Sequence, residues 1–116
     1  MVKSVQSPST VENVVQELRR GALILAALSQ LGDEKYGYAL INQLEEHGLE
    51  IDQGTLYPLL RRLESQGLLD SKWNVEGSRP RRYYVINKTG KAVLKELAME
   101  WRSLAKSMEK LLADVK

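Results

Sequence analysis

The sequence contains no cysteine. Disulfide bonds and thiolate metal sites are therefore excluded, and a reducing compartment is compatible with this composition. Long apolar runs are missing as well, because no N-terminal stretch looks like a signal peptide and no stretch is long enough to span a bilayer. From these absences we expect a soluble protein of the cytoplasm.

Histidine is scarce too, since His47 is the only one in the chain. It falls at the end of a predicted amphipathic helix, where the helix dipole favours a cation, so no catalytic role is needed to explain it. P-loop, GxSxG and HExxH motifs and paired metal-binding motifs are all absent from the sequence. We therefore expect a protein that is not an enzyme and that needs no metal or other cofactor.

The chain has little excess charge of either sign, with a formal net charge of only +2 at pH 7. Its basic side chains are nevertheless concentrated locally, because residues 72–82 contain four basic residues and only one acid, Glu76. A basic stripe on a nearly neutral body is typical of a DNA-binding surface. A solvated face would carry the same local charge, so this pattern alone leaves both interpretations open.

What the chain does have is regular hydrophobic periodicity, on a length of 116 residues that suits one domain. The spacing of apolar residues predicts helices over residues 9–31, 36–47, 52–66 and 87–114, and a β-hairpin with strands over 68–74 and 81–86. This order predicts a mainly α fold with a small β-hairpin, a winged helix-turn-helix plus a C-terminal dimerisation helix. The predicted divisions are a flexible N-terminus (1–8), a winged helix-turn-helix DNA-binding domain (9–86) and the dimerisation helix (87–116).

The third predicted helix has two distinct faces. Four leucines, Leu56, Leu59, Leu60 and Leu63, fall on one side at helical spacing and are predicted to be core residues. The opposite side is polar, and a recognition helix presents such a side to the major groove of DNA. The alternative interpretation is that the arginines on this side only solvate the helix.

The tip of the predicted hairpin, residues 77–82, combines glycine and serine with three arginines. Arginines at such a tip can contact phosphates or the minor groove. Charge that protects an exposed sheet edge from aggregation is the alternative. Because one face of the hairpin must cover the helices, Arg81 and Arg82 cannot both point to the same partner. The residues predicted to contact DNA are Tyr36, Gln53, Gly54, Thr55, Tyr57, Arg61, Arg62, Lys72, Arg79 and Arg81.

The last predicted helix carries a long apolar stripe with heptad spacing, which is typical of a seam between two helices. A winged helix of this size has little core left to cover such a stripe, so we expect a second copy of the chain in a two-fold dimer. Packing on the first helix of the same chain is the alternative, and both can hold together. The predicted interface residues are Leu94, Leu97, Ala98, Trp101, Leu104, Ala105, Met108, Leu111 and Leu112.

Several motifs occur in order and at matching distances over residues 18–90. They are LRRG at 18–21, YGY at 36–38, GTLYPLLRRLE at 54–64, GLL at 67–69 and GSRPRRYY at 77–84. On these motifs the chain resembles the PadR family of phenolic-acid-responsive repressors and their relatives. The resemblance implies a winged helix-turn-helix repressor that is dimeric through its first and last helices. It also implies that, in some members, binding of a ligand releases the repressor from DNA.

The chain departs from the usual family pattern in two places. The last helix usually begins with Leu-Thr-x-x-Gly, where this sequence has Ile86-Asn87-Lys88-Thr89-Gly90, and asparagine caps a helix as well as threonine does. A single helix follows the hairpin, so the chain resembles the short branch, which includes multidrug-sensing repressors. In those repressors a tryptophan of the last helix lines a pocket at the dimer centre. Trp101 stands at the matching place, which implies a ligand site at Trp101 and Ala105 for a planar aromatic effector; the alternative is that Trp101 only packs in the seam.

Two functional classes fit these observations. The first is a repressor that binds a pseudo-palindromic DNA operator as a dimer and responds to a ligand. The second is a winged-helix module for protein contacts without specific DNA binding. The arginines of the third helix and of the hairpin tip favour the first class.

Overall fold

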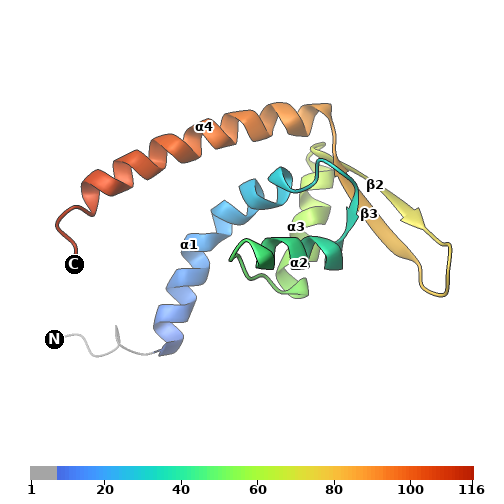
Figure 1. Ribbon diagram of the computed structural model, residues 1–116, viewed down its shortest axis with the longest axis horizontal. Helices are drawn as coiled ribbons and strands as arrows, with labels where there is room; N and C mark the ends of the chain where they lie inside the picture. Colours follow the sequence, from blue (N-terminus) through green and yellow to red (C-terminus); the bar gives the residue numbers. More distant parts are fainter. Residues whose placement is uncertain (1–7) are drawn as a thin grey trace.

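Four helices and a small sheet make up the part of the chain that the computed structural model describes, residues 8–116 (Figure 1). In chain order these elements are α1 (Pro8–Ser29), β1 (Lys35–Tyr36), α2 (Gly37–Glu46), α3 (Gln53–Ser65), β2 (Leu69–Asn74), β3 (Arg81–Ile86) and α4 (Lys88–Leu111). The predicted winged helix-turn-helix order is confirmed. Of the predicted flexible segment 1–8, residues 1–7 lie outside the described residues, and Pro8 begins α1.

The ends of the central helices follow from local sequence. Gly48 after α2 and Gly67 after α3 both adopt positive φ, +85° and +82°, which glycine reaches without steric cost. In each case the next residue donates its N–H back to the helix, from Leu49 to the Leu44 carbonyl and from Leu68 to the Leu63 carbonyl. These are Schellman-type ends, which stop each helix sharply and turn the chain toward the next element.

Asp52 caps the N-terminus of α3, because its carboxylate accepts a 2.8 Å hydrogen bond from the Thr55 N–H. Hydrogen bonds from Thr55, first of the side chain and then of the backbone, hold the pKa of Asp52 below its ordinary value of 3.8. Ionised Asp52 therefore stabilises the fold above that ordinary value, and the stabilisation is lost as the pH falls through the lowered pKa.

We expect Asp52→Ala to lower the melting temperature at pH 7, because the first turn of α3 then loses its cap. The difference from the wild type should shrink on acidification below about pH 3.8. Asp52→Asn is the matched control, since asparagine caps as well as aspartate does but does not titrate. An Asp52→Ala variant whose melting temperature equals that of the wild type at pH 7 would contradict this role for the cap.

The core lies where α1, α2 and α3 meet one side of the sheet, and it is built mainly of leucine. All four leucines predicted for the core face of α3 are buried, which confirms that prediction. The other buried hydrophobic residues are Leu23, Ala27, Leu28, Leu31, Leu40, Ile41, Leu44, Leu69, Tyr84 and Ile86. This packing fixes α3 against the sheet, and α3 is the helix on which most of the predicted DNA-contact residues lie.

The sheet has three strands in the order β1-β3-β2, all antiparallel, so the predicted hairpin gains a third strand. The prediction that the second helix begins at Tyr36 was wrong by one residue. Tyr36 instead pairs with Tyr83 of β3, and α2 begins at Gly37. A strand of two residues is too short to show alternation, and its partner is distant in the sequence, so periodicity could not reveal it.

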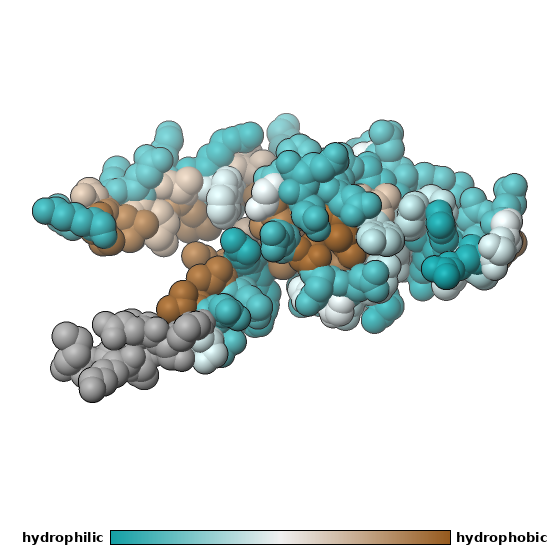
Figure 2. All heavy atoms as spheres, turned by 60° about the horizontal axis from the view of Figure 1, so that its bottom comes forward, coloured by the Kyte–Doolittle hydropathy of each residue, from teal (hydrophilic) through white to brown (hydrophobic). Residues whose placement is uncertain are grey.

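The helices α1 and α4 extend from the core as two diverging arms (Figure 1). The radius of gyration is 17.0 Å, whereas a compact chain of this length would have about 13 Å. Figure 2 shows hydrophobic surface on both arms. The predicted end of the last helix near residue 114 was slightly late, because α4 ends at Leu111 with Leu112 as its C-cap. Within the described residues, no helix is both long and apolar enough to cross a membrane.

Candidate nucleic-acid interface

A groove of about 480 Å³ runs between α3 and the β2–β3 hairpin, which we call the wing (residues 69–86). Six of the ten residues predicted to contact DNA line it. They are Tyr36, Gln53, Tyr57, Arg61, Arg79 and Arg81. We call this feature the reading groove, because it brings the polar side of α3 and the arginines of the wing to one surface.

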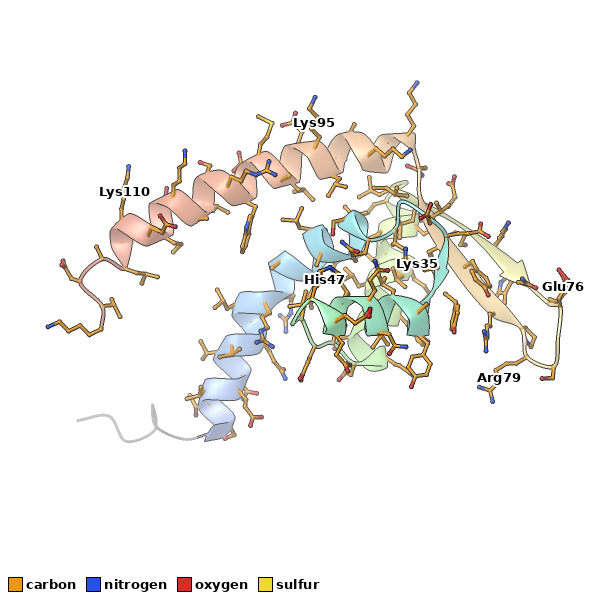
Figure 3. All side chains as sticks on the ribbon, in the orientation of Figure 1. Lys35, His47, Glu76, Arg79, Lys95 and Lys110 are labelled. Carbon is orange, nitrogen blue, oxygen red and sulfur yellow. The ribbon has the colours of Figure 1, made fainter. Side chains whose placement is uncertain are left out.

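The positive charge of the reading groove is available to a ligand. Arg61, Arg79 and Arg81 are all exposed, and none of them forms an ion pair with another described residue. Arg79 lies near the outer end of the wing (Figure 3). Unpaired guanidinium groups at two sides of a groove can bind phosphates or the acceptor edges of bases.

Tyr57 is half-buried, because it packs against the core on one side and lines the groove on the other. Its ring lies against Gly37, where a Cβ atom would come within 1.9 Å of ring atom Cε1. Gly37 therefore lets the ring approach the first turn of α2 closely. This contact fixes Tyr57 at the floor of the groove, while Arg61 lies one helical turn further along α3.

Arg81 and Arg82 point to opposite faces of the sheet, as predicted. The Arg81 guanidinium lies 4.4 Å from the centre of the Tyr36 ring, and the Tyr36 and Tyr83 rings meet edge to face at 5.5 Å. The strand register places Arg81 on the same sheet face as Lys72 and Tyr83, which is turned away from α3, so Arg81 borders the reading groove from its edge. The stacking leaves its N–H groups free to donate.

Arg82 turns toward α3 and is held there by side chains of the protein. Its Nη2 donates to Glu64 Oε1 at 2.8 Å, and its Nε donates to Ser71 Oγ at 3.1 Å. The Ser71 hydroxyl in turn donates to Glu64 Oε2. Burial raises the pKa of the neighbouring Tyr84 phenol, an effect that the Arg82 charge opposes. One of the three wing arginines is thus engaged inside the protein.

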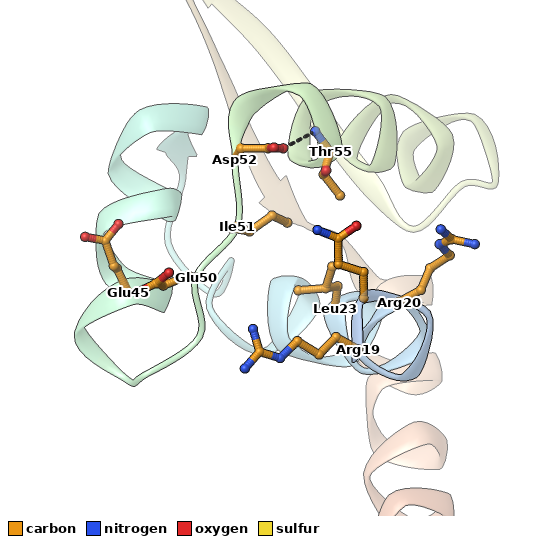
Figure 4. Close-up of a pocket in the computed structure, with 9 residues that line it drawn as sticks. Arg19, Arg20, Leu23, Glu45, Glu50, Ile51, Asp52 and Thr55 are labelled. Carbon is orange, nitrogen blue, oxygen red and sulfur yellow. Dashed lines mark hydrogen bonds between the residues drawn. The ribbon is translucent and has the colours of Figure 1, made fainter. Parts of the chain in front are cut away.

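Four predicted DNA-contact residues lie outside the reading groove. Gly54 is exposed on the first turn of α3, and Arg62 is exposed on another side of that helix. Thr55 lines a second hollow of about 570 Å³ between α1 and the loop before α3, beside Arg19 and Arg20 (Figure 4). Lys72 is exposed on the face of the sheet turned away from α3, where its ammonium lies 3.2 Å from the Glu34 carboxylate.

Two exposed aromatic residues of the groove were missed by the sequence analysis. Trp73 of β2 is 61% exposed, and Tyr38 on the first turn of α2 is also exposed. Strand alternation could have found Trp73, because it follows Lys72 directly and so points to the opposite sheet face, the one turned toward α3. The signal for Tyr38 was its place in the YGY motif, two residues after Tyr36.

The predicted interface stripe of α4 divides into two parts. Leu94 and Leu97 are half-buried against the core of their own chain, so packing within the chain accounts for this end. From Trp101 onward, the large apolar residues of α4 are exposed. They are Trp101, Leu104, Met108 and Leu111, followed by Leu112 at the C-cap. Ala98, just before Trp101, and Ala105 are half-buried. The first half of α1 exposes Val11, Val14 and Leu18 in the same way.

Comparison with known proteins relates this chain to transcriptional regulators of one family. The sequence profile of the transcriptional regulator PadR-like family matches residues 24–96, from the last third of α1 into α4. The chain is 38% identical to the transcriptional regulator Rv3488 of Mycobacterium tuberculosis over 95 residues, covering 81% of this chain and 89% of that protein.

Solved structures agree with the sequence matches. A PadR family transcriptional regulator from Eggerthella lenta superimposes with a TM-score of 0.83 at 48% identity, covering 93% of this chain and 96% of that one. A transcriptional regulator from Clostridium thermocellum gives a TM-score of 0.77 at 29% identity, covering 86% and 99%.

Proposed function

Because this chain belongs to the PadR-like family of transcriptional regulators, which are DNA-binding proteins and not enzymes, we propose that it is a repressor of transcription. In this proposal it acts in the cytoplasm, as a homodimer on a pseudo-palindromic operator, and a small planar aromatic compound releases it. In this proposal residues 9–86 form the DNA-binding domain and residues 87–116 form the dimerisation helix.

The reading groove is the observation that carries the DNA-binding proposal. It combines one side of α3, from Gln53 to Arg61, with two wing arginines, Arg79 and Arg81, that form no ion pair with another described residue. In the proposed complex α3 enters the major groove, where Gln53 and Arg61 donate to base edges or phosphates. Arg79 and Arg81 contact the backbone on the flank.

The dimer proposal rests on the exposed apolar residues of the two arms. Met108, Leu104 and Leu111 on α4 and Val14 and Leu18 on α1 are far more exposed than the core leucines. Exposed apolar surface of this kind marks an association site in a soluble protein. A second copy related by a two-fold axis would cover α4 and α1 with their equivalents. The two reading grooves would then face half-sites about one helical turn apart.

A gel-shift experiment with the DNA upstream of its own gene tests the function most simply. We expect a shifted band on this duplex, weaker binding to an unrelated duplex of equal length, and affinity that falls steeply as salt is raised. Equal and weak binding to both duplexes would instead favour the protein-interaction module.

The effector proposal concerns Trp101, which lies on the exposed stripe between the small residues Ala98 and Ala105. Small neighbours leave space beside a large ring, and a two-fold axis would bring two such rings together. A planar aromatic compound could stack between them, at about 0.5–1.5 kcal/mol per offset-stacked pair beyond area burial. The compound would release DNA only if it binds more tightly to a dimer whose two reading grooves are spaced differently from the two half-sites of the operator.

In a Trp73→Phe protein, Trp101 is the only tryptophan, so its fluorescence reports the proposed ligand site. We expect planar aromatic compounds to quench this emission saturably and to weaken operator binding over the same concentration range. Trp101→Ala should make operator binding insensitive to those compounds. If a varied panel gives no saturable quenching, Trp101 serves only in packing.

A further inference from the structure

The wing is joined to α3 by a small polar network of Glu64, Ser71 and Arg82, which we call the wing anchor. Glu64 comes from the last third of α3, Ser71 from β2 and Arg82 from β3. The Arg82 guanidinium donates to both of the other side chains, and the Ser71 hydroxyl donates to Glu64. Each member therefore contacts the other two, so both strands of the wing are tied to the helix.

Partial burial makes this ion pair stronger than the other two in the described part of the chain. The side chains of Arg82 and Glu64 are 34% and 27% exposed. The pairs Lys72–Glu34 and Arg20–Glu17 are much more open to solvent. Exposed pairs contribute little, whereas a hydrogen-bonded pair shielded from water holds its geometry.

Two aromatic rings complete the surroundings of the Arg82 guanidinium, which lies 5.7 Å from the Trp73 ring centre and 5.6 Å from that of Tyr84. Trp73 is paired with Arg82 across the strands and also lines the reading groove. The anchor is thus adjacent to the groove, which Arg82 also lines. Two nitrogens of the Arg82 guanidinium already donate to Ser71 and Glu64, whereas Arg79 and Arg81 form no ion pair with another described residue.

We infer that the wing anchor is a positioning device, which holds the wing at the angle to α3 that lets both contact one duplex at once. This inference rests on the proposed DNA-binding function. Glu64, Ser71 and Arg82 act through Arg79 and Arg81 and do not themselves contact DNA. It follows that α3 and the wing move as one body, so an effector changes the distance between the two reading grooves of the proposed dimer and does not act by bending the wing alone.

Ser71 gives the sharpest test, because Ser71→Ala and Ser71→Thr differ in the hydroxyl but not in charge. In a Trp101→Phe background, where Trp73 is the only tryptophan, Ser71→Ala and Glu64→Ala should change Trp73 emission in the DNA-free protein. Ser71→Thr should keep the wild-type emission. Glu34→Gln, which breaks the exposed ion pair to the wing, should also leave the emission unchanged.

The positioning role is then measured as the coupling between substitutions in the wing anchor and Arg79→Ala at the wing tip, with operator affinity as the readout. With the anchor intact, Arg79→Ala should weaken operator binding by about tenfold and flatten the salt slope by about one unit. In the Ser71→Ala and Glu64→Ala backgrounds, the same Arg79→Ala change should cost less than about twofold, because a loose wing no longer places Arg79 at the backbone. In the Ser71→Thr background, Arg79→Ala should again weaken operator binding by about tenfold, as it does with the anchor intact.

Two results would overturn the inference. One is Trp73 emission that does not respond to Glu64→Ala, which would mean that the anchor does not order the wing. The other is an Arg79→Ala cost that is the same in every background. A wild-type protein that binds no duplex would refute the proposed function instead, and the emission measurement on free protein would still decide whether the anchor orders the wing.

Discussion

Replacing Met108 by glutamate should convert the protein from a dimer to a monomer. Met108 is 48% exposed in the single chain and lies on the apolar stripe of α4. A dimer seam would bury the new carboxylate without a partner, which costs several kcal/mol. We expect the dimer dissociation constant to rise at least about 100-fold, as measured by sedimentation equilibrium.

Met99 offers a matched control on the same helix. It is nine positions from Met108, which is about half a turn around an α-helix, and it is 55% exposed. It therefore lies on the side of α4 that faces away from α1, where Figure 3 shows Lys95 and Lys110. Met99→Glu should leave the dimer intact. Dissociation by both variants, or by neither, would contradict the assignment of the seam to the Met108 side.

The Met108→Glu protein should also lose most of its operator affinity. A monomer reads one half-site, whereas a dimer gains from the high effective concentration of its second reading groove, a gain of about 100-fold or more. Because Met108 is exposed in the single chain, the winged helix should keep its fold. Helical circular dichroism should confirm this and separate lost dimerisation from unfolding.

Removing one arginine from each side of the reading groove should have the second large effect. Arg61→Ala should cost roughly 1–3 kcal/mol if Arg61 reads a guanine, and it should relax sequence preference at that position. Arg79→Ala should act similarly on all sequences. The two side chains lie on different elements, so their effects should nearly add, and the double variant should bind its operator about 100-fold more weakly or worse.

The control for this double variant must remove the same charge elsewhere. Lys95→Ala with Lys110→Ala does so, because both lysines are exposed on α4 away from the reading groove. Fluorescence anisotropy with labelled duplex at fixed salt should show near wild-type affinity for this control. If the two double variants lose affinity equally, general electrostatic attraction accounts for binding and the groove is wrongly assigned.

The sequence predicted the elements well because each leaves a local signal. The leucine spacing that predicts the core face of α3 can be recognised within residues 56–63 alone. The glycines after α2 and α3 mark the ends of those helices directly. The two-residue strand β1 left no such signal. Its existence depends on pairing with Tyr83, nearly fifty residues later, and tertiary pairing of this kind is invisible to periodicity.

The groove could be predicted only in part, for a similar reason. The sequence pattern placed arginines on α3 and on the wing. It could not show which of these arginines form ion pairs with other side chains of the protein. Arg82 reaches Glu64 through a contact between residues eighteen positions apart, while Arg81 next to it forms no ion pair with another residue of the range 8–116. Likewise, that Arg61 and not Arg62 lines the groove depends on how α3 is rotated against the sheet.

The most direct test of a dimeric reader of DNA is a hydroxyl-radical footprint on the tightest-binding duplex selected from a random pool. The account predicts two protected patches in inverted orientation, with centres about 34–36 Å apart along the helix axis. Each patch should weaken in the Arg61→Ala/Arg79→Ala protein. A single protected patch, or uniform protection along every duplex, would contradict the account.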